Sequence, residues 1–145
     1  MTKRILGIDY GKKRIGLAIT STVAAFALPL TTIEHNGSIP KAALLLKKTL
    51  LDLKDVEDVV LGWPLHFNGT LSPLCKEVEE LKSLLEKNPG IKVHLMDERL
   101  TTKIAEESYR SHGYSRKARK AHLDQAAAVL ILNAFLEKTL RSHPS

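Results

Sequence analysis

Three acidic residues, far apart in the sequence, stand where a carboxylate has a chemical use. Asp9 ends an apolar run between Gly7 and Gly11, Glu98 follows another apolar run, and Asp124 precedes a string of alanines. A charge beside a buried strand is costly unless something pairs with it. Carboxylates from separate segments suit Mg²⁺ or Mn²⁺, hard cations that bind oxygen ligands together with water and phosphate. We therefore predict that Asp9, Glu98 and Asp124 are metal ligands and catalytic residues.

The chemistry that this cluster predicts is phosphodiester hydrolysis. Two divalent ions about 3.5–4 Å apart can activate water and stabilise the leaving oxygen. In the predicted arrangement Asp9 bridges the two ions, and Glu98 and Asp124 complete the site. The attraction of the carboxylates for the cations offsets the repulsion among the carboxylates themselves.

Each carboxylate also has a structural interpretation. Asp9 could be a turn residue in a hairpin. Glu98 could be a solvated loop residue paired with Arg99, and Asp124 could stabilise the positive end of a helix dipole. Asp97 is an alternative to Glu98 as the site residue. Because neighbouring residues on a strand face opposite sides of the sheet, only one of the two should point to the site.

The elements that must position these residues form an α/β pattern. Strand patterns cover residues 3–10, 14–20, about 24–34, 56–62 and 91–96, and helix patterns cover 40–53, 73–87, 101–110 and 122–140. Three consecutive strands followed by alternating helices and strands predict a mixed five-stranded sheet, with three antiparallel strands, then parallel strands, and helices on both faces. Such sheets bind ligands at the carboxyl ends of their parallel strands, where Asp9 and Glu98 fall.

Size and composition indicate one globular domain. The chain has 145 residues, of which 43% are hydrophobic and 26% charged, and no composition shift divides it, so we predict a single domain over residues 1–145. The net charge of +6 and the pI near 9.5 favour anionic partners such as nucleic acid, nucleotides or a membrane surface.

Cys75 is the only cysteine, which excludes a disulfide framework and a thiolate zinc site. The apolar run after the N-terminus is too short for a signal peptide, and no run reaches a membrane-spanning length. We therefore expect a cytoplasmic protein with no membrane partner.

Two basic segments flank the carboxylates, one directly after Asp9 and one within residues 108–123, which contain no acidic residue. Such segments suit a phosphate backbone that must reach a metal, although solvated charge runs look the same. Arg99 could bind substrate or neutralise Glu98. The predicted nucleic-acid-binding residues are Lys12, Lys13, Arg14, Arg99, Arg116, Lys117, Arg119 and Lys120.

Four motifs occur in order and at family-like spacing, and the third is the most specific. They are Gly7-Ile8-Asp9-Tyr10-Gly11, Gly62-Trp63-Pro64-Leu65 with Asn68-Gly69-Thr70, Asp97-Glu98-Arg99-Leu100-Thr101-Thr102, and Asp124-Gln125-Ala126-Ala127-Ala128. Over essentially its whole length the chain closely resembles the bacterial YqgF-type proteins, Holliday-junction-resolvase-like members of the ribonuclease H-like superfamily that are described as candidate pre-16S rRNA nucleases.

The resemblance implies a ribonuclease H-like fold and a metal-dependent nuclease that matures the 5′ end of precursor 16S rRNA. It carries Asp9, Glu98 and Asp124 over as the catalytic carboxylates, and it implies structured RNA, branched DNA or ribosomal particles as partners. The family usually has aspartate where this chain has Asn68, and we expect Asn68 to be a turn residue or a substrate contact.

Other functions fit parts of the pattern. A Holliday-junction resolvase would use the same carboxylates on four-way DNA, and a non-catalytic RNA-binding or ribosome-assembly factor could keep the fold without the reaction. Actin-like and sugar-kinase nucleotide sites also begin with a strand, an aspartate and a glycine-bearing hairpin, but they use two such domains around the nucleotide. The sequence leaves open whether the protein is a monomer or a homodimer.

Overall fold

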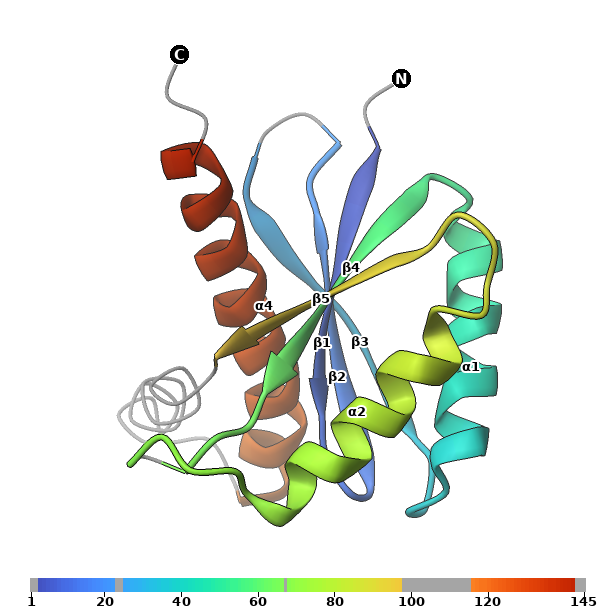
Figure 1. The fold of residues 1–145 in the computed structure, drawn as a ribbon, viewed down its shortest axis with the longest axis vertical. Coiled ribbons are helices and arrows are strands. Elements are labelled where there is room, and N and C mark those ends of the chain that lie inside the picture. Colours follow the sequence, from blue (N-terminus) through green and yellow to red (C-terminus); the bar gives the residue numbers. More distant parts are fainter. Residues whose placement is uncertain (1–2, 23–24, 67, 98–115, 143–145) are drawn as a thin grey trace.

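The computed structural model describes residues 3–22, 25–66, 68–97 and 116–142, and within the last helix it describes the side chains of residues 124–139 (Figure 1). The elements, in chain order, are β1 (Arg4–Tyr10), β2 (Arg14–Thr20), β3 (Ala27–Glu34), α1 (Ile39–Leu53), β4 (Val56–Trp63), α2 (Pro73–Leu85), β5 (Lys92–Asp97) and α4 (Arg116–Ser142).

The five strands form one sheet in the order β3-β2-β1-β4-β5. β1 pairs antiparallel with β2, and β2 with β3, whereas β4 lies parallel to β1 and β5 lies parallel to β4. The predicted mixed sheet is therefore confirmed. Because β1, β4 and β5 run in the same direction, their carboxyl ends, at Tyr10, Trp63 and Asp97, reach the same edge of the sheet.

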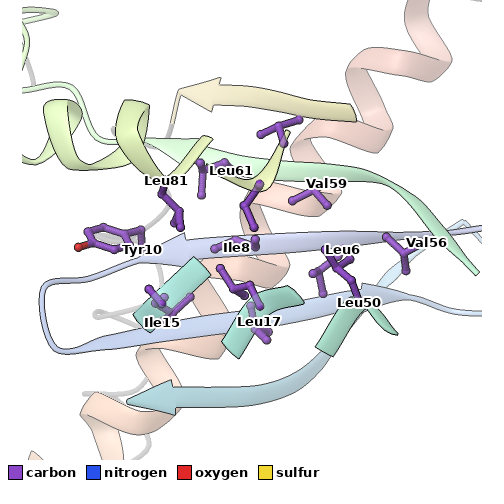
Figure 2. Packing of buried hydrophobic residues seen from close by; sticks show 14 of the residues in the cluster. Leu6, Ile8, Tyr10, Ile15, Leu17, Leu50, Val56, Val59, Leu61 and Leu81 are labelled. Carbon is purple, nitrogen blue, oxygen red and sulfur yellow. The ribbon is translucent and has the colours of Figure 1, made fainter. Parts of the chain in front are cut away.

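α1 and α2 cover one face of the sheet, and α4 covers the other (Figure 1). On the α1/α2 face, Leu6, Ile8 and Tyr10 alternate along β1 and point to the same side (Figure 2). They join a core of large aliphatic side chains from both helices and from β2, β4 and β5. Burial of such side chains contributes about 1.5–3 kcal/mol each, so this face carries most of the hydrophobic stabilisation.

α1 begins at Ile39, one residue before the predicted start. The side chain of Ser38 accepts a hydrogen bond of 3.2 Å from the amide of Lys41, and Pro40 lies in the first turn. The helix buries one side chain every fourth residue along a single stripe, at Ala42, Leu46 and Leu50.

α4 is longer than the predicted helix 122–140, because it begins at Arg116. The basic residues of its first turns are good helix formers, and neither glycine nor proline interrupts them. The predicted helix 101–110 lies outside the described residues. No helix in the described part of the chain combines the length and the apolar character that crossing a membrane requires.

Candidate functional site

Asp9 is a strand residue that faces α4. It pairs with Gly16 across β1 and β2, and the hairpin turn lies beyond it, at residues 11–13. Leu6 and Ile8 belong to the core on the α1/α2 face, so alternation places Gly7 and Asp9 on the α4 face. The side chain of Asp9 is therefore at the carboxyl end of a parallel strand, and the residue is half-buried.

Gly16 brings α4 into contact with the sheet beside Asp9. A Cβ atom on Gly16 would lie 1.9 Å from the carbonyl oxygen of Asp124 and 2.8 Å from the amide nitrogen of Gln125. The helix backbone thus rests directly on β2 at the residue that pairs with Asp9. Cross-strand partners have Cα atoms about 4.5–5.5 Å apart, so the backbone of Asp124 lies close to Asp9 on the α4 face.

A second close approach and two hydrogen bonds fix how α4 lies on the sheet. A Cβ atom on Gly7 would lie 2.9 Å from Cβ of Leu132, two helical turns after Asp124. The Nε2 group of Gln125 donates to Oγ1 of Thr32 on β3 at 3.0 Å, and the Oδ1 atom of Asn133 accepts from an amide of β3 at 3.0 Å. These contacts prevent α4 from rotating and so set the position of Asp124.

Arg14 forms an ion pair with Asp124. Its Nε group donates to Oδ2 of Asp124 at 3.2 Å, and the two side chains are 31% and 24% exposed. Arg14 lies two residues before Gly16 on β2 and therefore on the same face. Lys12 and Lys13, by contrast, are exposed at the tip of the same hairpin.

The register of β5 shows which face of the sheet Asp97 occupies. Its register with β4 is continuous to Asp97, which pairs with Trp63. Val93 and Trp63 belong to the core on the α1/α2 face, and Met96 packs on the α4 face. Alternation therefore places Asp97 on the face opposite Asp9. Glu98 and Arg99 lie outside the described residues.

The predicted basic residues of the last helix lie at the same end of α4 as Asp124. Arg116, Lys117, Arg119 and Lys120 occupy its first turns, and their side chains are outside the described set. The helix thus brings a basic segment and an acidic residue to the same edge of the sheet.

His35, which the sequence analysis did not identify, supports the hairpin. It is fully buried, and its Nε2 atom is 2.6 Å from the carbonyl oxygen of Gly11. The amide of Gly37 donates to Nδ1 at 3.2 Å, so Nδ1 is the acceptor and Nε2 carries the proton. The backbone amide of His35 also donates to the carbonyl of Lys13 at 3.0 Å. One side chain therefore joins the turn before α1 to the turn after Asp9.

Tyr10 connects the same hairpin to α2. Its ring stacks on that of His35 at a centroid distance of 5.3 Å, and its hydroxyl donates to Oε1 of Glu77 at 3.1 Å. Burial raises the pKa of Tyr10 far above its usual range, and the hydrogen bond to Glu77 raises it further. The phenol remains a neutral donor, so the side chain at the end of β1 is held both by His35 and by α2.

The loop after β4 is ordered by its own side chains. Oδ1 of Asn68 accepts from the amide of Thr70 at 3.0 Å and from its hydroxyl at 2.6 Å. This contact makes Asn68 a turn residue. Ser72 occupies the N-cap position of α2 but does not cap it, because its hydroxyl donates to the carbonyl of Pro64 across the loop.

The donor chemistry of Asp9 and Asp124 fits a hard divalent cation. They bring carboxylate oxygens from two elements to one face, and Mg²⁺ usually takes one or two protein carboxylates together with water and phosphate. Among the side chains that the structure describes, in residues 3–22, 25–66, 68–97 and 124–139, no three from His, Cys, Asp or Glu are grouped closely enough to hold an ion. Glu98, the third predicted ligand, is outside those ranges.

Comparison with known proteins supplies the family. Residues 3–138 match the RuvX family, described as Holliday junction resolvase. A protein of Chlamydia caviae named "Putative pre-16S rRNA nuclease" is 40% identical over 139 residues, which cover 94% of this chain and 85% of that protein. A protein of Desulfitobacterium hafniense with the same name is 38% identical over 134 residues, covering 92% of each chain.

Solved structures share the fold at low identity. Thermus thermophilus RuvC, in complex with a Holliday junction substrate, superposes with a TM-score of 0.60 at 17% identity, covering 96% of each chain. The fowlpox virus resolvase, in complex with Holliday junction DNA, gives a TM-score of 0.57 at 16% identity, covering 94% of this chain and 99% of that one. The predicted ribonuclease H-like fold is therefore confirmed.

Proposed function

This chain belongs to the RuvX family, and from that premise we propose that it is a nuclease that hydrolyses phosphodiester bonds in structured RNA. We further propose that it depends on Mg²⁺ or Mn²⁺ and acts in the 5′-end maturation of precursor 16S rRNA. The observation that supports the proposal is the contact of the α4 backbone at Asp124 with Gly16, the residue that pairs with Asp9 at the edge where the parallel strands end.

In this proposal Asp9 and Asp124 hold the cations. The sheet keeps the carboxylate of Asp9 in place, and α4 keeps that of Asp124 in place. Two divalent ions bound there would supply an activated water and stabilisation of the leaving oxygen. The chain contributes rigidity, because Asp9 is within a central strand and the helix backbone under Asp124 is in contact with β2. Rigid support is what keeps such groups in productive geometry.

Glu98 completes the proposed site by elimination. Of the two acidic residues at the end of β5, Asp97 is on the face opposite Asp9, which leaves Glu98 as the candidate third ligand. The family resemblance assigns the same residue.

The proposed substrate follows from charge and from the relatives. The net charge of +6 and the basic segments at residues 12–14 and 116–120 suit a phosphate backbone. Relatives named as pre-16S rRNA nucleases favour RNA, with ribosomal particles as the setting. Four-way DNA is the second candidate, because the family description is Holliday junction resolvase.

The test compares Asp9→Asn with Asp97→Asn. Both variants remove one carboxylate near the same sheet edge, but from opposite faces. We expect Asp9→Asn to lower the rate of precursor 16S rRNA cleavage in Mg²⁺ by at least about 10²–10³-fold, with RNA affinity and thermal stability near those of the parent. Asp97→Asn should retain most of the activity.

Three results would argue against the proposal. Equal cleavage rates for Asp9→Asn and the parent would overturn the mechanism. Cleavage of four-way DNA but not of precursor RNA would replace the substrate. Normal 16S maturation in cells that carry asparagine or glutamine at positions 9, 98 and 124 together would favour a non-catalytic assembly factor.

A further inference from the structure

Arg14 differs from its basic neighbours in what it contacts. Lys12 and Lys13 are exposed on the hairpin, whereas the guanidinium of Arg14 is turned onto the α4 face and donates to Asp124 Oδ2 at 3.2 Å. An arginine held in this way occupies one oxygen of a carboxylate that the proposed function needs. It therefore has a role that a solvated phosphate-binding side chain lacks.

The ion pair has two opposing consequences for cation binding. Arg14 neutralises Asp124, whose backbone contacts the residue that pairs with Asp9, so it stabilises the protein without bound metal. The same positive charge, within a few ångströms of the place where a divalent ion would bind, opposes that ion by Coulomb repulsion. Affinity for the cation should therefore rise when the charge of Arg14 is removed or drawn away.

A nucleic-acid phosphate is the group that can draw Arg14 away. Guanidinium binds carboxylate and phosphate with the same planar donor geometry, so exchanging one for the other keeps its hydrogen bonds. Lys12 and Lys13, on the same hairpin, would bring a phosphate backbone near Arg14.

We propose that Arg14 is an exchangeable counter-cation that couples nucleic-acid binding to divalent-cation binding. Without nucleic acid it pairs with Asp124; with a phosphate bound it releases Asp124 to the cation. This inference rests on the proposed function of Asp9 and Asp124 as cation ligands. Because such coupling is reciprocal, nucleic acid must raise cation affinity by the same factor by which the cation raises nucleic-acid affinity.

The experiment measures Mn²⁺ affinity by titration calorimetry, with and without a short single-stranded RNA that is checked to be intact afterwards. For the parent protein we expect the RNA to raise Mn²⁺ affinity at least about fivefold. For Arg14→Gln we expect higher Mn²⁺ affinity in the absence of RNA, with the effect of RNA largely lost. The metal-free variant should also melt at a lower temperature than the parent.

Lys13→Gln is the matched control, because it removes the same charge from the same hairpin but from an exposed position. It should weaken RNA binding and leave Mn²⁺ affinity without RNA unchanged. Arg14→Lys keeps the charge and should keep Mn²⁺ affinity near that of the parent.

The outcomes separate this inference from the proposed function. If the parent binds no Mn²⁺, or if Asp9→Asn does not weaken Mn²⁺ binding, the proposed function fails. If Mn²⁺ binds through Asp9 but Arg14→Gln leaves both its affinity and the effect of RNA unchanged, the counter-cation role of Arg14 is wrong and the proposed function stands.

Discussion

The two faces of the sheet are built from different residues. The face under α1 and α2 is filled by large aliphatic side chains such as Ile8 and Leu61 (Figure 2). The face under α4 has glycine at positions 7 and 16 and alanine at position 18, with Asp9 and Asp124 at its end. Large side chains stabilise the fold, whereas small ones let a helix backbone come near enough to bring two carboxylates together. The larger hydrophobic core therefore lies on one face of the strands, and the two candidate carboxylates lie on the other.

The largest expected effect tests the α1/α2 face. Leu61 is fully buried, and Leu61→Ala would leave a cavity in a packed core. We expect a loss of about 2–5 kcal/mol in the free energy of unfolding, measured by urea denaturation. Because Leu61 points away from Asp9, the cleavage rate per folded molecule should change little. A rate loss that exceeds the folded fraction would break the separation of the two faces.

The next effect tests the α4 face. Gly16→Ala would place a Cβ atom 1.9 Å from the carbonyl oxygen of Asp124, so α4 must move away from β2. We expect cleavage to fall about a hundredfold, because a displacement of about 1 Å can have that effect on a reacting geometry. Gly90→Ala is a control for the loss of a glycine, since nothing lies within 4 Å of its added Cβ, although its positive φ will strain the alanine. Unchanged cleavage by folded Gly16→Ala protein would show that this approach does not position the site.

The sequence predicted from local features that the helix carrying Asp124 packs closely on the sheet edge that holds Asp9. The alanines after Asp124 indicated a helix that packs closely, and strand order placed Asp9 at the relevant edge. Gly16 could not be identified in the same way, because its role depends on the register of β1 against β2. A period-2 pattern gives the face of each residue but not its partner on the next strand.

His35 was missed for a different reason. A histidine before an Asn-Gly turn looks like a surface residue, and its importance comes from bonds to Gly11, which is remote in the sequence. At the end of β5, by contrast, a local pattern was informative. Strand alternation predicted that only one of Asp97 and Glu98 faces the site, and the register of β5 against β4 shows which face Asp97 occupies.

A smaller effect tests whether His35 stabilises the hairpin that follows Asp9. His35→Phe keeps an aromatic ring against Tyr10 but leaves the carbonyl of Gly11 without its donor. We expect a loss of about 1–3 kcal/mol in the free energy of unfolding, because a buried acceptor loses its partner. His35→Gln, whose amide can donate and accept, should recover part of it. Urea denaturation of the three proteins measures the difference, and equal stability of all three would show that the hairpin needs no such support.

The smallest effect concerns an ion pair at the opposite end of β1 from Asp9, between Arg4 and Asp55. Arg4 donates to both carboxylate oxygens of Asp55 at 2.6 and 2.8 Å, and this hydrogen bonding, aided by the positive charge, lowers the pKa of Asp55. A carboxyl whose folded pKa lies below its unfolded value of about 3.9 stabilises the protein above that pH, and the contribution is lost as pH falls through the folded pKa. Since both side chains are about a quarter exposed, we expect the ion pair to contribute about 1 kcal/mol to the free energy of unfolding.

Asp55→Asn should therefore lower the free energy of unfolding at pH 7 by about 1 kcal/mol. Below about pH 4, the free energy of unfolding of this variant should fall less steeply with decreasing pH than that of the parent. Urea denaturation at a series of pH values measures both effects. A matching loss at pH 7 and at acidic pH would show that the pair contributes through packing and not through charge.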